Sequence, residues 1–126
     1  MVWRDCPLSE LKDGFSSVLS DDDCACFIIS VDGQAVGFAQ CGLRRDYVEG
    51  TNSSPVGYLE GIFVEKAFRE KGYAKELLLA CENWARAQGC REFASDCELT
   101  NKDSLSFHLK TGFKEAGRII CFVKKL

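Results

Sequence analysis

Residues 57–78 have the sequence GYLEGIFVEKAFREKGYAKELL, in which an apolar run, a charged loop and a helical pattern follow one another. The run at 57–65 predicts a β-strand, and its interior glycine, Gly61, indicates a bulge or the close approach of a ligand or another backbone. Residues 74–89 predict a helix, because their apolar side chains recur at helical spacing and Gly89 suits a C-cap. The stretch therefore predicts a strand that leads through a loop into a helix.

The loop between this strand and this helix, residues 68–74, carries Arg69 and Lys71 beside Gly72 and Ala74. Backbone N–H groups at the start of a helix point outward at the positive end of its dipole and bind anions. Gly72 lets the backbone approach an anion closely, and the small Ala74 leaves the N–H groups uncovered. The loop favours a phosphate site, although two solvated loop charges would give the same pattern, since one glycine-rich match is weakly specific.

Length and charge limit the class of protein. The chain has 126 residues and a mass of 14.0 kDa, which predicts one domain over residues 1–126. A formal net charge of -3 and a pI near 5.2 argue against a nucleic-acid partner and leave room for a cationic substrate. No apolar run reaches the roughly 20 residues that span a bilayer, so no membrane partner is expected.

The chain contains eight cysteines. It shows no signal-peptide pattern and has enough strand and helix patterns to build a core without disulfides, so we expect reduced thiols and a cytoplasmic location. No Cys-x-x-Cys pair with zinc-ligand spacing occurs, and no metal site is predicted.

Local patterns predict the other elements of an α/β domain built around a mixed sheet. In chain order they are a short helix at 8–20, a hairpin at 25–44 that turns at Asp32–Gly33, a surface loop at 44–56, a short strand within 90–99, a helix at 102–111 capped by Asn101, and a final strand pair or one bent strand at 113–126.

Two motifs occur in order along this pattern. The first is Arg69-x-x-Gly72-x-Ala74 after an apolar strand, and the second consists of Asn101, Ser104, His108, Gly112 and Phe113. They resemble the pyrophosphate loop, Gln/Arg-x-x-Gly-x-Gly/Ala, and the downstream Asn, small residue, aromatic residue and Gly-Phe of the GCN5-related N-acetyltransferase (GNAT) superfamily. The resemblance extends from about residue 25 to the C-terminus.

Within the superfamily the chain looks most like the aminoglycoside 6'-N-acetyltransferases. The segments that carry the likeness are RRDYVEGTNSSPVGYLEGIFV (44–64), FREKGYAKELL (68–78), GCREFASDCELTN (89–101) and GFKEAGRIICFVKK (112–125). The resemblance implies a GNAT fold, a mixed central sheet flanked by helices, shortened at the N-terminus because VWRDCP (2–7) resembles the end of the family's first helix. The missing first strand would expose a sheet edge unless another chain or a rearranged start covers it.

The resemblance also implies an acetyl-CoA-dependent N-acetyltransferase, in which a neutral amine attacks the thioester directly in a ternary complex. Glu60 would position and deprotonate the amine, directly or through water; the alternative is a plain outward strand carboxylate. His108 replaces the tyrosine that the family commonly uses as the acid for the CoA thiolate; the alternative is a structural histidine on a short helix.

Four residues are expected to contact an aminoglycoside or another cationic amine substrate. Glu60 is joined by Asp96, which follows the short strand and could instead cap a turn. Tyr47, in the long loop, resembles a substrate-loop tyrosine, and Trp3 would wall the cleft; both could equally be packing aromatics. Gly117 stands where the family often has an acidic residue, so one substrate contact is expected to be absent.

On the cofactor side, the resemblance implies that backbone groups of one strand pair with the pantetheine arm and that loop N–H groups hold the pyrophosphate. One strand amide would also donate to the oxyanion. The residues expected to bind acetyl-CoA are Ile62, Phe63, Val64, Arg69, Lys71, Gly72, Tyr73, Ala74 and Asn101, the last of which could instead be only an N-cap.

The resemblance makes a homodimer the expected assembly. Two alternatives to aminoglycoside acetylation stay open at this point. One is acetylation of another polyamine or of a protein amine with the same cofactor half. The other is a weakly active acetyl-CoA-binding module, which the shortened start and His108 would both fit.

Overall fold

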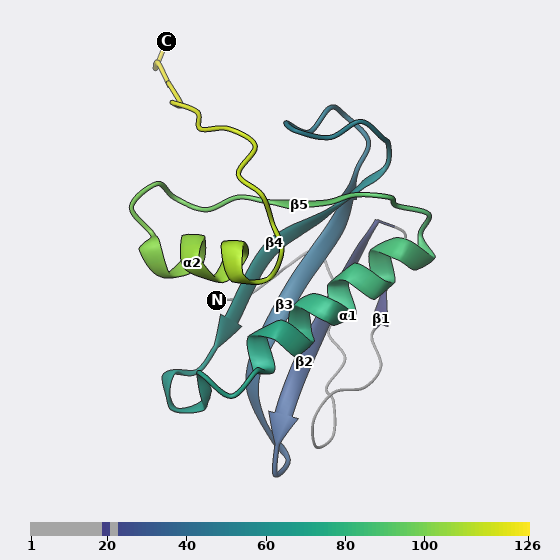
Figure 1. Cartoon of the computed structure of the whole chain (residues 1–126), viewed down its shortest axis with the longest axis vertical. Helices are drawn as coiled ribbons and strands as arrows, with labels where there is room; N and C mark the ends of the chain where they lie inside the picture. The colour runs from purple at the N-terminus through teal and green to yellow at the C-terminus, as the bar shows by residue number, and fades with distance from the viewer. Residues whose placement is uncertain (1–18, 21–22) are drawn as a thin grey trace. The chain divides into compact units, whose positions relative to one another are not determined.

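The computed structural model describes residues 19–20 and 23–126 (Figure 1). The chain forms two compact units that meet between Asp96 and Cys97, and each is described by itself; a single domain stays a prediction. The elements are β1 (Leu19–Ser20), β2 (Cys24–Val31), β3 (Gln34–Arg44), β4 (Val56–Val64), a 3₁₀ turn (Lys66–Phe68), α1 (Tyr73–Ala87), β5 (Phe93–Ser95) and α2 (Lys102–Lys110).

The first unit is built on a five-stranded sheet in the order β1-β2-β3-β4-β5. The first four strands run antiparallel to their neighbours, whereas β5 is parallel to β4. The predicted mixed sheet is therefore confirmed. The hairpin is also confirmed: Asp32 and Gly33 have φ values of 50° and 80°, as a tight turn between right-twisted strands requires.

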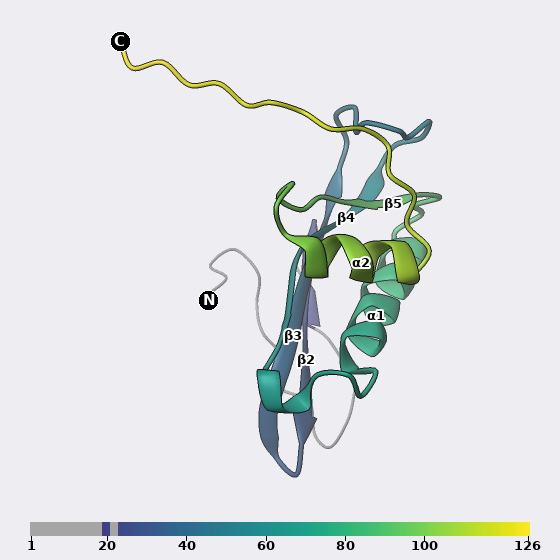
Figure 2. The same ribbon diagram turned by 60° about the vertical axis from the view of Figure 1, so that its left-hand side comes forward.

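Helix α1 covers one face of this sheet, as the two views show (Figure 1, Figure 2). Its buried side chains include Leu77, Leu78, Cys81 and Trp84, at the spacing that the sequence predicts. The helix packs against β2, β3 and β4, whose buried residues include Ile29, Ala39, Cys41 and Leu59. Burial of this apolar stripe holds the helix on the sheet, since intrinsic propensity alone rarely stabilises a helix of this length.

A glycine lets α1 approach β4 closely. A Cβ built on Gly57 would lie 2.6 Å from the Cβ of Ala85 and 2.6 Å from Cδ1 of Phe93. Both distances are far shorter than a van der Waals contact, so any side chain at position 57 would push the helix or β5 away from β4. The glycine therefore fixes the spacing of the layers beneath the site described below.

The second unit contains α2, which begins at its predicted cap. The Asn101 side chain accepts a hydrogen bond from the backbone N–H of Ser104 at 3.0 Å, and the helix ends before Gly112, whose φ is 100°. The prediction of a final strand pair or bent strand at 113–126 is wrong for this structure, which assigns these residues to neither strand nor helix. β-rich composition alone does not make a strand, because a strand exists only where its backbone finds a partner.

Six of the seven cysteines in the described part of the chain have the expected reduced state. Cys26, Cys41, Cys81, Cys90, Cys97 and Cys121 are free. Cys24, however, is disulfide-bonded, so the expectation of reduced thiols is wrong at that position. The sequence could not show this, because a disulfide depends on which Cα atoms the fold brings together.

Other predictions concern residues that lie outside the described part of the chain. These are the helix at 8–20, of which only Leu19–Ser20 is described and is a strand; the shortened start at 2–7; and Trp3. The described edge of β2 pairs with β1. None of the helices in the described part of the chain has the length and apolarity that crossing a bilayer requires.

Candidate active site

A bulge in β4 sets the position of Glu60. Gln40 of β3 pairs with Gly61 and the next residue, Cys41, pairs with Leu59, so Glu60 is the extra residue without a partner across the strand pair. The irregularity that Gly61 indicated is therefore present, displaced by one residue. A bulge bends a strand and re-aims the extra side chain, which here is an exposed carboxylate.

Arg44, the last residue of β3, holds this carboxylate. Its Nη2 donates to both oxygens of Glu60, at 2.9 Å and 3.1 Å. The guanidinium carbon also lies 3.4 Å from the ring centroid of Tyr58, which is a close cation–π stack. Arg44, Tyr58 and Glu60 therefore form one cluster, because the Arg44 side chain contacts both of the other two.

Tyr58 links this cluster to Asp96. Its hydroxyl donates to Oδ2 of Asp96 at 2.5 Å, across the parallel β4–β5 pair. Burial, together with the hydrogen bond to Asp96, raises the pKa of Tyr58 to about 12. The phenol thus stays a donor, and Asp96, just after β5, is fixed by it and not by capping the following turn.

Glu92, the residue before β5, anchors the loop between β3 and β4. The Glu92 carboxylate accepts hydrogen bonds from the backbone N–H of Asn52 at 2.8 Å and from the Ser53 hydroxyl at 2.5 Å. The Ser53 hydrogen bond, followed by the Asn52 N–H, lowers the pKa of Glu92. Tyr47 of the same loop is 75% exposed, and its hydroxyl accepts a hydrogen bond from the Gly50 N–H at 3.4 Å.

The pairing of β4 with β5 ends at Leu59, before the end of β4. The two strands pair from Gly57 to Leu59, while β4 continues to Val64 and keeps its pairing with β3 there. Its β5-facing backbone groups beyond Leu59 are thus where an extended ligand can add as a further strand. Within this segment Phe63 is exposed and Val64 is buried.

The turn after β4 leads directly to the start of α1. Arg69 donates from Nε to the carbonyl of Val64 at 2.8 Å, and its guanidinium lies over the Phe63 ring at 5.7 Å. Glu70 and Gly72 have φ values of 63° and 85°, so the chain doubles back tightly before the helix. The N-cap of α1 is Gly72, and within the described part of the chain no side-chain cap is present there, which suits anion binding by the first N–H groups.

Two predicted residues lie in the second unit. Asn101 is the N-cap of α2, so its carboxamide oxygen is already used. His108 Nδ1 lies 2.7 Å from the carbonyl oxygen of Ser104. Because a carbonyl oxygen only accepts, Nδ1 is the donor in this contact. Phe113 packs beside this ring, with the centroids 5.0 Å apart.

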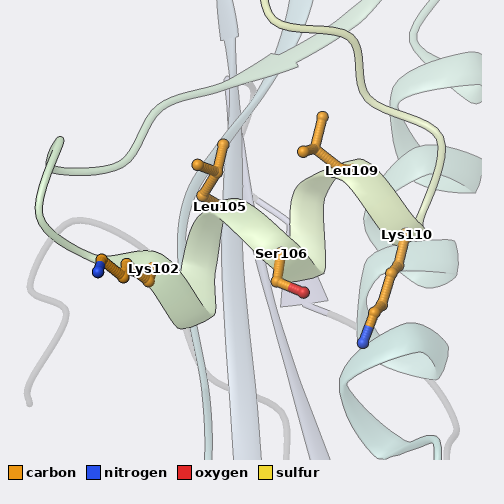
Figure 3. A pocket seen from close by; sticks show the side chains of 5 residues that line it. All are labelled: Lys102, Leu105, Ser106, Leu109 and Lys110. Carbon is orange, nitrogen blue, oxygen red and sulfur yellow. The ribbon is translucent and has the colours of Figure 1, made fainter.

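The second unit also has an open hollow of about 450 Å³ on one side of α2 (Figure 3). It is lined by Lys102, Leu105, Ser106, Leu109 and Lys110; in Figure 3 the two leucines extend from one side of the helix, and Ser106 and Lys110 from the other. Two lysines repel an amine substrate, and the hollow has no carboxylate, so it does not suit the chemistry of the Glu60 cluster. Among the described residues, no group of three or more His, Cys, Asp or Glu side chains could hold a metal ion.

The structure brings together Glu60 and Asp96 through two residues that sequence reasoning missed, Arg44 and Tyr58. Tyr58 had a signal, since it alternates with Glu60 along a predicted strand. Arg44 had none, because its contact depends on the register between β3 and β4. Trp3 lies outside the described residues, and the relation of Asn101 and His108 to this cluster stays a prediction.

The fold has known counterparts. The family described as Acetyltransferase (GNAT) family matches residues 1–113, and the chain belongs to that family. The chain is 45% identical over 117 residues to an aminoglycoside N(6')-acetyltransferase type 1 of Salmonella typhimurium, covering 93% of this chain and 80% of the relative. It is 41% identical over 124 residues to the enzyme of that name from Stenotrophomonas maltophilia, covering 96% and 78%.

Solved structures of similar proteins agree. The aminoglycoside N-acetyltransferase AAC(6')-Iy in complex with CoA superposes with a TM-score of 0.81 and 46% identity, covering 84% of this chain and 79% of that chain. The same enzyme in complex with a bisubstrate analogue, CoA-S-monomethyl-acetylneamine, superposes with a TM-score of 0.81 and covers 72% of that chain. The predicted GNAT fold is therefore confirmed.

Proposed function

We propose that this protein is an aminoglycoside 6'-N-acetyltransferase that transfers the acetyl group of acetyl-CoA to a primary amine of the antibiotic. The observation that carries the proposal is the high identity to enzymes of that activity over most of both chains. The Glu60 cluster supports it, because an exposed carboxylate beside an aromatic face suits a cationic amine. Such a transfer inactivates the antibiotic and is a resistance activity.

The described residues fit acetyl-CoA as cosubstrate, which supplies the thioester. The segment Ile62–Val64 offers a strand edge for the pantetheine arm, and one of its N–H groups is the proposed oxyanion donor. Lys71, Gly72, Tyr73 and Ala74 offer N–H groups to the pyrophosphate at the uncapped start of α1, and Arg69 braces this turn against Val64. Asn101 is proposed to reach the pantetheine with its amide nitrogen, since its oxygen is the N-cap.

Glu60 has the central catalytic role in this proposal. It takes a proton from the substrate ammonium, directly or through water, and so frees the lone pair that attacks the thioester carbon. Asp96 and Tyr47 contact other parts of the polycation, and Trp3 is proposed to wall the same cleft. His108 is proposed as the acid that protonates the leaving thiolate.

We also infer that the protein works in the cytoplasm as a homodimer. The location is supported by the cosubstrate, because acetyl-CoA is an intracellular metabolite. The dimer is supported by the apolar tail: Ile119, Ile120, Phe122 and Val123 are all at least 80% exposed in the single chain. An exposed apolar run of this kind needs a partner. We propose neither a membrane nor a nucleic-acid partner.

Thiol release from acetyl-CoA tests the function. It is measured with kanamycin A and with an analogue that carries a hydroxyl in place of the 6'-amine. The proposal predicts turnover of the amine compound alone. Turnover of peptides or simple polyamines in preference to kanamycin A would favour another amine substrate, and acetyl-CoA binding without turnover would favour a binding module; either result would reject the proposed function.

A further inference from the structure

Arg44 contacts the same carboxylate that the proposed function assigns to the substrate amine. A cationic amine at Glu60 requires a carboxylate to accept its N–H groups and an aromatic face to lie against. In this structure both are taken by one side chain: Nη2 donates to the two oxygens of Glu60, and the guanidinium stacks on Tyr58 at 3.4 Å. The cluster thus already contains a cation, the guanidinium of Arg44.

The chemistry of the two cations makes them competitors. A guanidinium and an alkylammonium both donate to carboxylate oxygens, and each is attracted to the face of a phenol ring. Glu60 is the bulge residue and supplies one carboxylate. Binding an amine at its oxygens therefore costs part of the pairing with Arg44.

The Arg44 side chain is exposed enough to move away from Glu60. It is the last residue of β3, at the start of the long loop, and its side chain is 43% exposed. Leaving Glu60 requires only the rotation of an exposed side chain, and exposed ion pairs are weak.

We propose that Arg44 is a specificity-determining residue, an internal occupant of the amine subsite that a cationic substrate must displace from Glu60 and Tyr58. This proposal rests on the proposed function, because it takes Glu60 as the residue that binds the amine. Arg44 raises the KM for cationic amines and favours substrates whose charge and contacts suffice to replace it.

The test compares Arg44→Gln and Arg44→Lys with Arg45→Gln as a matched control. Arg45 is the adjacent arginine and pairs with Asp23 at 2.9 Å, so its replacement makes the same change in net charge away from Glu60. We expect the KM for kanamycin A to fall about threefold or more in Arg44→Gln, the size of one exposed ion pair. It should stay within about twofold of wild type in Arg44→Lys and Arg45→Gln, while the KM for acetyl-CoA is unchanged in all three.

Three results would overturn the proposal. An unchanged or raised KM with a lower kcat in Arg44→Gln would make Arg44 an aid to Glu60 and not a competitor. An equal fall of the KM for kanamycin A in Arg45→Gln would mean that only the net charge of the protein matters. An equal fall in Arg44→Lys would show that the positive charge at position 44 is not what competes with the substrate. If wild type does not turn over kanamycin A, the proposed function fails separately, and calorimetric binding of kanamycin A to the same variants still tests the displacement.

Discussion

At the scale of single residues, the site depends on one extra residue in one strand. Gly61 signalled an irregularity in β4, and the structure shows that the residue without a partner is Glu60. The glycine was a local signal for the bulge, whereas the role expected for Glu60 came from the family resemblance. Its partner Arg44 could not be predicted, since the contact follows from a register set across the whole strand pair.

Replacing Glu60 by Gln tests its role. The amide cannot accept the ammonium proton, so we expect kcat for acetyl transfer to fall about 100-fold or more, the usual contribution of a positioned base. Acetyl-CoA affinity, measured by calorimetry, should change less than about twofold. Glu65→Gln, one position past β4, is the control and should leave both values near wild type. Equal losses of acetyl transfer and of acetyl-CoA binding would show that Glu60 does not act specifically on the amine substrate.

Tyr58→Phe tests the link to Asp96 through its pH dependence. The folded-state pKa of Tyr58 is raised to about 12, above its ordinary value of 10.0, so its stabilisation is full below about pH 10 and is lost as pH rises toward 12. We expect the variant to lose about 1 kcal/mol of unfolding free energy at pH 8. This deficit, measured by urea unfolding, should shrink at pH 11. A deficit that is constant with pH would mean that only packing was lost.

At the scale of elements, local patterns predicted the hairpin, β4, β5 and both helices, because turn glycines, caps and apolar spacing lie within each segment. The tail at 113–126 shows the limit of this reasoning. Its apolar residues are of the kind that strands use, yet it is not a strand in the single chain. Composition indicates that a segment can pair, whereas pairing itself requires a free edge that the segment does not contain.

The turn before α1 can be tested with two matched glycines. Gly72 and Gly33 have φ values of 85° and 80°, and a Cβ on either would meet nothing within 4 Å. Alanine at each position should therefore cost a similar amount of unfolding free energy, about 1 to 2 kcal/mol, through the left-handed backbone alone. Only Gly72→Ala should also raise the KM for acetyl-CoA. An equal rise of the KM for acetyl-CoA in Gly33→Ala, at the hairpin turn, would mean that the rise comes from lower stability and not from a lost contact with acetyl-CoA.

At the scale of the whole molecule, the GNAT family and the relatives account for the fold, and the tail accounts for the expected assembly. The sequence resemblance predicted the family from two spaced motifs, and the family match over residues 1–113 confirms it. The number of chains in the assembly cannot be predicted from a short sequence motif of this kind. It depends on surfaces that become complementary only after folding.

Removing the tail tests the dimer. The intact protein is expected to have about twice the 14.0 kDa chain mass by light scattering, since Ile119, Ile120 and Phe122 are too exposed to stay unpaired. A chain that ends at Phe113 should be a monomer. A full-length variant with serine at these three positions is the control for chain length, and should also be a monomer. A monomeric intact protein, or a dimer in both variants, would contradict the role of the tail.

The central claim is that acetyl-CoA lies along β4 and ends at the start of α1, within reach of an amine held by Glu60. Amide hydrogen exchange with and without acetyl-CoA tests this most directly, because it reports the backbone groups themselves. We predict slower exchange at Ile62–Val64 and at Lys71–Ala74, with no change at the Asp32–Gly33 turn. Slower exchange confined to other segments, or no change at all on addition of saturating acetyl-CoA, would contradict the account.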